Sequence, residues 1–419
     1  MSYQMLDGLR VIESSAFVAA PLAGLTLNQY GADVIRVDMI GGGLDYARLP
    51  RMENRRSLYW TGLNKGKRSV AIDLKRPEGR ELVQAMVTAP GEGGGVLLTN
   101  IATPWLDHAL LARRRADLIS CIIQGNADGS TALDYTVNCA AGYPAMTGHG
   151  SLQNPVNNAL PAWDLACGYQ AAFTILAAVM RRRATGEGAL MKIALSDAAF
   201  TTLSHLGVMA EAQLLEQDRP SIGNNLYGAF GRDFGCSDGG RVMVAAISIG
   251  QWQSLVKACG VGEAIAQLEA RTGADFRDEA QRYDAHDAIS ALIEPWFAAR
   301  TREQAERVLE EHRVCWGRYG TVRELLERDA RVDPAKNPVF ERITTPAIGA
   351  HTAAGATARL EGEARLPTAP APLLGTHTDE VLHQVLGLDS AAIGRLHDAG
   401  VVAGPERDPT QAGSSRVSS

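Results

Sequence analysis

The chain has 419 residues, of which 46% are hydrophobic and 21% are charged, and its formal net charge at pH 7 is −6. This composition is typical of a globular enzyme and excludes a fibrous or largely disordered protein. The basic runs are limited to Arg113–Arg115 and Arg181–Arg183, which argues against nucleic-acid binding as the main function. We expect both runs to be solvated helix ends.

The length favours two domains over one. We expect no membrane segment, because no apolar run approaches the roughly 18 residues that cross a bilayer, and no secretion signal is recognisable at the start. The six cysteines occur singly, which is typical of reduced thiols in a cytoplasmic protein. The nine histidines show no metal-binding spacing, so we expect no metal.

The first half alternates strands and helices, as in a doubly wound α/β domain whose ligands bind at the carboxyl ends of the strands. A dinucleotide site is disfavoured, because the first turn, 14–24, contains no GxGxxG. The cations of 64–68 precede a strand and are either a solvated charge run or a phosphate-facing loop. A helix begins with Pro77 at its first position. Strands are predicted at 8–14, 33–38, 96–100 and 118–124.

The segment 160–188 predicts a long helix with one ionisable residue near its start. Pro161 breaks the preceding segment, and Gly186 ends the helix. Asp164 lies at the N-cap or in the first turn, where a carboxylate stabilises a helix. It is either an ordinary cap or a nucleophile that the helix dipole keeps ionised, and its position alone leaves both open. The apolar face is predicted to consist of Leu165, Tyr169, Ala172, Phe173, Leu176 and Val179.

The second half changes character after residue 218. We predict a strand at 191–195 and one helix from Ser196 to about Leu215. The large domain is expected to cover 1–224, a smaller domain of hairpins and amphipathic helices 225–330, and a return to the large domain 331–404. The polar segment 405–419 is expected to be a flexible tail.

Several segments, in the same order over nearly the whole chain, resemble the family III CoA-transferases: LDGLRVIE, GADVIRVD, GLNKGKRSVAIDLKRPEGRE, the Asp164 helix with TGEG, and LGTHTDEVL. The family includes formyl-CoA and carnitine CoA-transferases and α-methylacyl-CoA racemases. The segments SAFVAAPLAG, IGGGLDY, DYTVN, LPAWD and NLYGAFGRDF most resemble members that move CoA between the two carboxylates of one C5 dicarboxylate.

This resemblance implies a Rossmann-like large domain formed by both termini, a smaller inserted α+β domain and an interlocked homodimer. It also implies an acyl-CoA substrate, with CoA as part of that substrate and no permanently bound cofactor. Asp164 matches the family's nucleophilic aspartate, which attacks the thioester and later carries CoA as an aspartyl thioester. Contacts to CoA are implied for Ala19 near the thioester, Arg36 beside the nucleotide, Ile72 and Lys75 near the adenine and phosphates, and Asn100 in the CoA groove.

A dicarboxylate substrate also needs a cation or polar donor for its free carboxylate. The candidates are Arg48, Tyr227 and Arg232, with a solvated surface arginine as the alternative for Arg48. Some transferases have Gln in place of Val18 and a tetraglycine lid loop in place of 247–250.

The sequence therefore predicts an intramolecular CoA-transferase. One alternative is an intermolecular transferase with a separate dicarboxylate donor, which would depend on an added acid. A 2-methylacyl-CoA racemase would exchange the α-proton in deuterated water, but Leu133 replaces the racemase histidine in front of Asp134, which disfavours two-base chemistry. A CoA-binding regulator would bind CoA without thioester exchange.

Overall fold

The computed structural model describes residues 2–411, which form two compact units. Unit 1 contains the chain up to Ala141, then Asn158–Ala210, and then the part from Ala330 onward. Unit 2 contains Gly142–Asn157 and Glu211–Asp329. Unit 2 therefore starts before residue 225, the boundary predicted from the sequence, and it also includes a short segment that precedes the Asp164 helix.

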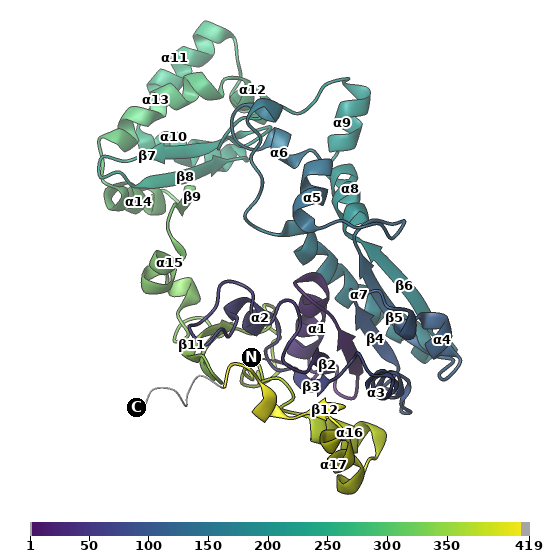
Figure 1. Ribbon diagram of the computed structural model, residues 1–419. Helices are drawn as coiled ribbons and strands as arrows, with labels where there is room; N and C mark the ends of the chain where they lie inside the picture. Colours follow the sequence, from purple (N-terminus) through teal and green to yellow (C-terminus); the bar gives the residue numbers. More distant parts are fainter. Residues whose placement is uncertain (1, 412–419) are drawn as a thin grey trace. The chain divides into compact units, whose positions relative to one another are not determined.

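Unit 1 is built on a seven-stranded sheet in the order β12-β3-β2-β1-β4-β5-β6 (Figure 1). The first six strands along the chain are parallel, and β12 pairs antiparallel with β3. Because the strand order reverses direction between β1 and β4, their carboxyl ends border the crevice where doubly wound folds bind ligands. The strands are β1 (Arg10–Ser14), β2 (Asp33–Met39), β3 (Arg68–Ile72), β4 (Val96–Thr99), β5 (Ile119–Gln124), β6 (Ala189–Ala194) and β12 (Val402–Ala403).

Helices connect these strands in the right order for βαβ crossovers. The helix that begins at Pro77 is present with proline at its first turn. The single helix predicted up to about Leu215 is interrupted at Gly207, whose φ of 76° ends the first part. The helices of unit 1 in this part of the chain are α1 (Ala19–Gln29), α2 (Leu58–Leu63), α3 (Pro77–Thr88), α4 (His108–Ala112), α5 (Asp134–Ala140), α7 (Ala162–Thr185) and α8 (Leu195–His205). The next helix, α9 (Val208–Leu214), begins in unit 1 and ends in unit 2.

The apolar face predicted for α7 is wrong for two of its large residues, which are exposed and not buried. Tyr169 and Phe173 are 57% and 68% exposed, whereas the small residues on the other side are buried. The reason is the close approach of α1: a Cβ atom on Gly168 would lie 2.9 Å from the carbonyl oxygen of Ala19. Small residues allow the two helices to touch along their length, and the larger side chains remain outside. Among the described residues α7 is the one helix long and apolar enough to cross a membrane, a property that buried core helices share.

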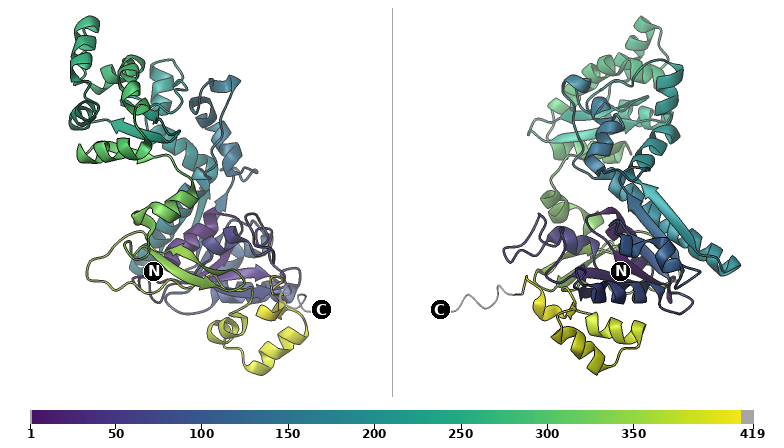
Figure 2. Two further views of the ribbon diagram at one scale, coloured as in Figure 1. Left: turned by 90° about the vertical axis from the view of Figure 1, so that its left-hand side faces the viewer. Right: turned by 45° about the vertical axis from the view of Figure 1, so that its right-hand side comes forward.

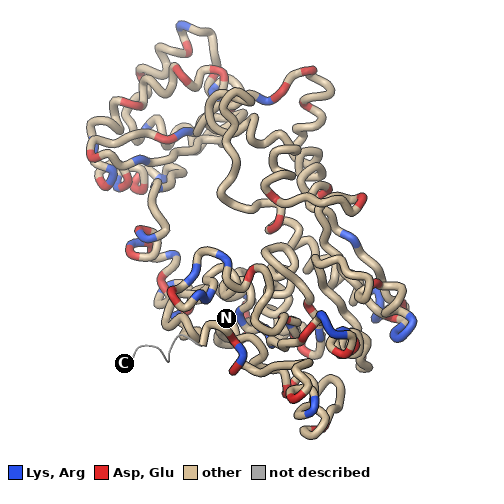
Figure 3. The backbone as a smooth tube through the Cα atoms, viewed as in Figure 1, with Lys and Arg blue, Asp and Glu red and all other residues tan. Residues whose placement is uncertain are grey.

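Arg182, near the end of α7, is buried and is not the solvated helix end that we expected. Its guanidinium donates to the carbonyl oxygens of Gly94 at 2.9 Å and Gly95 at 3.2 Å. It therefore fixes the glycine loop before β4. Elsewhere in both units Lys and Arg are interspersed with Asp and Glu (Figure 3).

Unit 2 is built on a three-stranded antiparallel sheet in the order β7-β8-β9. Helices pack against this sheet around an aromatic core in which Phe234 stacks on Phe297 with 4.7 Å between ring centroids. The strands are β7 (Phe230–Gly235), β8 (Arg241–Ala246) and β9 (Cys315–Arg318). The helices are α6 (Tyr143–Met146), α10 (Ile249–Cys259), α11 (Gly262–Thr272), α12 (Glu279–Asp284), α13 (His286–Ala298), α14 (Arg302–Glu311) and α15 (Val322–Arg328).

The chain then returns to unit 1 through the hairpin of β10 (Phe340–Thr345) and β11 (Gly349–Ala354). Two helices, α16 (Thr378–Leu386) and α17 (Ser390–Asp398), lie side by side before β12 (Figure 2). The predicted flexible tail is wrong for residues 405–411. Asp408 is 2% exposed and accepts a hydrogen bond from the Leu374 N–H at 2.8 Å. The rest of the predicted tail, 412–419, lies outside the described residues.

Candidate active site

The carboxyl ends of β1 and β4 are joined by Asn100. Its side-chain oxygen accepts a hydrogen bond from the Ala16 N–H at 2.9 Å, and its side-chain nitrogen donates to the Ala16 carbonyl at 2.7 Å. The next residue, Phe17, has a φ of 65°, a conformation that is rare without glycine, and its N–H donates to Asp45 at 2.9 Å. The loop that leads into α1 is therefore held in one conformation at the ligand-binding edge of the sheet.

The start of α1 offers hydrogen-bond donors. Val18 is the N-cap residue, and no side chain among the described residues caps the first-turn N–H groups. Such groups stabilise negative charge that develops on a substrate atom. Ala19, the first residue of α1, was expected near the thioester, and its carbonyl lies against Gly168 in α7.

Asp164 lies in the first turn of α7, one helical turn before the contact with α1. Its side chain is half-buried, and its pKa is raised to about 7 by burial and by the charge of Asp134, while Arg48 has the opposite effect. The interpretation of Asp164 as a nucleophile assumes that the helix dipole keeps this carboxyl ionised. The pKa rises because desolvation and a second carboxylate outweigh the dipole.

The true cap of α7 is Asp134, the first residue of α5, and not Asp164. Asp134 is 4% exposed, and its Oδ2 accepts hydrogen bonds from the N–H groups of Trp163 at 2.7 Å and Asp164 at 3.0 Å. The indole N–H of Trp163 donates to Asn138 in α5 at 3.1 Å. No local sequence signal marks this role of Asp134, because it depends on a tertiary contact between α5 and α7.

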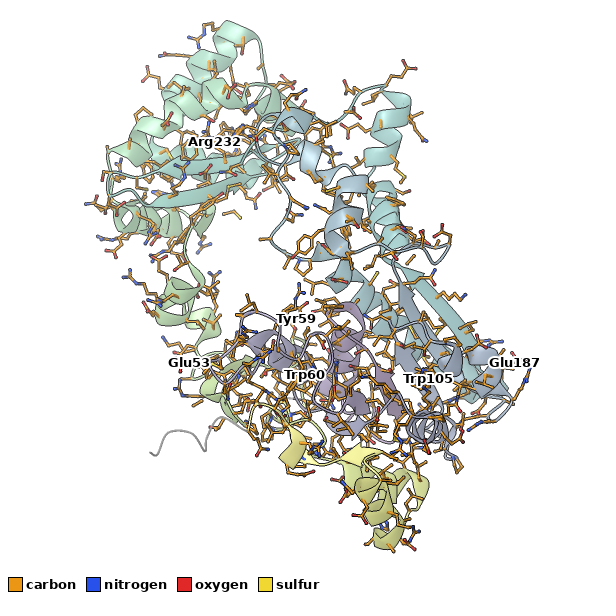
Figure 4. The ribbon with its side chains drawn as sticks, in the orientation of Figure 1. Glu53, Tyr59, Trp60, Trp105, Glu187 and Arg232 are labelled. Carbon is orange, nitrogen blue, oxygen red and sulfur yellow. The ribbon has the colours of Figure 1, made fainter. Side chains whose placement is uncertain are left out.

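Arg48 is an exposed cation whose charge acts on Asp164. Its guanidinium lies 5.4 Å from the ring centroid of Phe17 and 5.3 Å from that of Tyr59. Within residues 2–411 its guanidinium makes no hydrogen bond and no ion pair, although its charge acts on Asp164. Burial raises the pKa of Tyr59 to about 12, so the phenol is neutral near pH 7 and can donate a hydrogen bond. Tyr59 lies in α2 (Figure 4) and was not singled out from the sequence.

Arg36 has a different environment from the one that its predicted contact with the nucleotide requires. It is 2% exposed, and burial alone would lower its pKa, but the charges of Asp38 and Glu13 outweigh burial and raise it. All of its donors are used inside the protein, so its role toward CoA stays a prediction. The partners are Asp38 at 2.9 Å, Glu13 at 3.1 Å, the hydroxyl and carbonyl of Ser15 at 3.0 Å, Asn64 at 3.2 Å and Asp45 at 3.5 Å.

The neighbouring cations are divided between the interior and the surface. Lys67 is buried and its ammonium donates to Glu13 and Asn64, each at 2.9 Å. It is therefore neither part of a solvated charge run nor a phosphate contact. Arg68 pairs with Asp33, and its Nε lies 2.8 Å from that carboxylate.

The other predicted contact residues are placed as follows. Ile72 is fully buried at the end of β3, and Lys75 is exposed in the loop that follows it. Tyr227 and Arg232 lie in unit 2: the Tyr227 hydroxyl donates to Glu211 at 2.6 Å, and Arg232 lies 5.4 Å from the Phe234 ring (Figure 4). Their roles, like those of Ile72 and Lys75, stay predictions.

The segment 247–250, which replaces the tetraglycine loop, is the capped start of α10. The Ser248 hydroxyl accepts from the Gln251 N–H, and the Gln251 side chain accepts from the Ser248 N–H at 3.0 Å. This capping box explains why a helix forms here. Among residues 2–411 no group of three or more His, Cys, Asp or Glu side chains could hold a metal ion.

Comparisons with known proteins agree with this geometry. Residues 6–378 match the model of CoA-transferase family III. The chain is 50% identical to 2-methylfumaryl-CoA isomerase of Chloroflexus aurantiacus over 405 residues, which are 96% of this chain and 99% of that protein. It is 26% identical to a formyl-CoA:oxalate CoA-transferase of Rhodopseudomonas palustris, over 96% of this chain and 98% of that protein.

Solved structures have the same fold. A CaiB/BaiF family protein from Brucella suis superposes with a TM-score of 0.74 and 23% identity, covering 92% of this chain and all of that one. Rv3272 from Mycobacterium tuberculosis gives a TM-score of 0.71 with 21% identity over 90% of this chain and 99% of that one. The chain is an enzyme that acts on CoA thioesters, and it belongs to CoA-transferase family III.

Proposed function

We propose that this enzyme moves CoA between the C1 and C4 carboxylates of mesaconate, converting 2-methylfumaryl-CoA into 3-methylfumaryl-CoA. The observation that carries the proposal is a half-buried carboxyl, Asp164, on which the charge of Arg48 acts, while the Arg48 guanidinium has no hydrogen bond or ion pair among the described residues. A nucleophile and a holder for a free carboxylate are what a dicarboxylyl thioester needs. The relative from Chloroflexus aurantiacus, with its name and its identity over almost the full length, supports this substrate.

The first half of the reaction loads the enzyme. The ionised Asp164 attacks the C1 thioester carbonyl, and N–H groups at the start of α1 stabilise the oxyanion. The C–S bond breaks, CoA leaves as a thiolate, and a mixed anhydride remains. The thiolate then attacks the Asp164 carbonyl carbon, which gives aspartyl-CoA and releases mesaconate with one Asp164 oxygen in its C1 carboxylate.

The second half repeats these steps at the other end of the same molecule. Mesaconate turns within the site, and its C4 carboxylate attacks aspartyl-CoA and expels the thiolate. The thiolate attacks the C4 carbonyl of the new anhydride and regenerates the Asp164 carboxylate, which keeps one oxygen from the substrate. No proton is gained or lost overall. Arg48 holds whichever carboxylate is free, so the acid stays bound and transfer benefits from proximity.

The enzyme is also proposed to be a cytoplasmic homodimer. The cysteines, all free, suit a reducing compartment. Tyr169, Phe173 and Met180 expose 57%, 68% and 71% of their surface along α7, and exposed apolar side chains on one helix are typical of an interface. Sedimentation of the purified protein tests the dimer.

An intermolecular transferase is the second candidate, because relatives at 26% identity are named formyl-CoA:oxalate CoA-transferases. One experiment separates the two. The enzyme is incubated with 2-methylfumaryl-CoA and a tenfold excess of ¹³C-labelled free mesaconate, and the products are analysed by chromatography and mass spectrometry. Intramolecular transfer yields unlabelled 3-methylfumaryl-CoA without any added acid. Label in the product, or no turnover until an acid is added, would contradict the proposal.

A further inference from the structure

The start of α7 has no cap of its own. The N-cap residue is Pro161, which has no side-chain donor or acceptor, so the first-turn N–H groups need a partner from elsewhere. Asp134 supplies it with a single oxygen, at 2.7 Å from the Trp163 nitrogen and 3.0 Å from the Asp164 nitrogen. A carboxylate from another helix thus fixes the turn that carries the nucleophile.

Asp134 also brings a second negative charge next to Asp164. Its carboxyl group is almost completely buried, so water screens this repulsion little. When Asp164 is acylated, its own charge disappears and reappears on the CoA thiolate. The repulsion between the two carboxylates is therefore present before attack and is relieved in the anhydride.

We propose that Asp134 is a positioning residue that orients Asp164 through the first turn of α7 and, by its charge, makes Asp164 a stronger nucleophile. This inference rests on the proposed function, in which Asp164 attacks the thioester. The charge effect is separate from the cap, because an uncharged oxygen would accept the same two hydrogen bonds.

Besides Asp134, three titratable or charged groups adjoin Asp164 or interact with it electrostatically: Arg48, Tyr59 and Cys167. The positive charge of Arg48 lowers the pKa of Asp164. Burial raises the pKa of Tyr59 to about 12 and also that of Cys167, one turn along α7, to about 12, so both are neutral between pH 5 and 9. Within the described residues, Asp134 is thus the negative charge that acts on Asp164.

The test uses two variants of the full-length enzyme and one control. Asp134→Asn keeps an oxygen for the two N–H groups but removes the charge, whereas Asp134→Ala removes both. Asp128→Asn alters an exposed turn aspartate that accepts from the Ser130 N–H and serves as the control. The readouts are kcat and kcat/KM for 2-methylfumaryl-CoA between pH 5 and 9, and the thermal midpoint.

The proposal expects Asp134→Asn to move the acid limb of the kcat/KM profile down by about one pH unit. The plateau kcat should fall roughly threefold, if carboxylates follow the slope of about 0.4–0.5 between nucleophilicity and pKa known for thiolates. The thermal midpoint should stay near that of the wild type. Asp134→Ala should lose more activity and also stability. An unmoved acid limb and an unchanged plateau in Asp134→Asn would overturn the charge effect and leave only a structural cap.

A second measurement does not depend on turnover. The ¹³C carboxyl signal of Asp164, assigned by its loss in Asp164→Asn, is titrated in the wild type and in Asp134→Asn. A lower midpoint in Asp134→Asn supports the proposal, and equal midpoints overturn it. If the wild type does not convert 2-methylfumaryl-CoA, the proposed function fails, and this titration still decides whether Asp134 controls Asp164.

Discussion

Two arginines of unit 1 differ in almost every physical respect. Arg36, in β2, is surrounded by carboxylates and oxygen acceptors and has no donor left for a ligand. Arg48, in the loop after β2, lies over two aromatic rings, and among the described residues its guanidinium has no hydrogen bond or ion pair. A buried cation whose donors are all used stabilises the fold, whereas an exposed one that lacks partners can bind an anion.

The difference shows that a sequence resemblance does not separate an arginine that stabilises the fold from one that can bind a ligand. Arg36 matches a family position beside the nucleotide, but its side chain joins the ends of β1 and β2. Arg48 had a solvated surface position as its alternative, yet its charge acts on the candidate nucleophile. Variants of these residues and of Asp164 should therefore separate loss of stability from loss of activity.

The largest effect is expected for Asp164→Asn, which should reduce turnover by roughly 10³-fold or more because it removes the nucleophile. It should also raise stability at pH 8. The folded-state pKa of about 7 lies above the ordinary value of 3.8, so the ionised carboxyl favours the unfolded state above pH 7, and this cost declines progressively as the pH falls from 7 toward 3.8. We expect a gain of roughly 1–3 kcal/mol in urea unfolding at pH 8. Residual activity above a tenth of the wild type would refute the assignment.

Arg36→Met should lose stability, by about 3–5 kcal/mol, more than activity, because the buried Asp38 would lose its ion pair and the buried Glu13 would keep only its pair with Lys67. Urea unfolding measures this loss. Arg114→Gln is the control: its pair with Glu81 is partly exposed, and the cost should stay below about 1 kcal/mol. If Arg36→Met were as stable as the wild type but bound acyl-CoA poorly, Arg36 would be a ligand residue after all.

Arg48→Gln should leave stability unchanged and lower kcat/KM for 2-methylfumaryl-CoA by about 10- to 100-fold, as expected for the loss of a charged hydrogen-bond donor to substrate. A monocarboxylic acyl-CoA that binds the enzyme should lose no affinity. Arg51→Gln is the matched control, since this exposed side chain donates only to the Ala47 carbonyl among the described residues. Equal kinetics in the two variants would remove Arg48 from the site.

Tyr59→Phe should have the smallest effect, about threefold or less on kcat/KM. The ring that lies beside the Arg48 guanidinium is kept, and only a neutral hydroxyl is lost. Steady-state kinetics at pH 8 measure the change. A loss larger than that of Arg48→Gln would mean that the hydroxyl, and not the cation, holds the substrate.

Much of the sheet and the helix that carries Asp164 could be predicted from the sequence. The alternation of strands and helices and the residues that end a helix are recognised from short stretches of neighbouring residues. Side-chain environments were not predictable in the same way. The cap from Asp134, the saturation of Arg36 and the exposure of Phe173 all depend on which helix or strand packs alongside. Asp408 was assigned to a tail because its segment is polar, yet it is buried by contacts with residues far away in the sequence.

The covalent role of Asp164 is tested most directly by following oxygen. The enzyme is incubated with 2-methylfumaryl-CoA that carries ¹⁸O in its C4 carboxylate. It is then digested, and the mass of the peptide that contains Asp164 is measured by mass spectrometry. The proposed mechanism predicts that ¹⁸O appears in the Asp164 carboxyl group as the isomer forms, and that Asp134→Asn gains the label more slowly. Isomer formation without ¹⁸O in Asp164 would contradict an aspartyl intermediate.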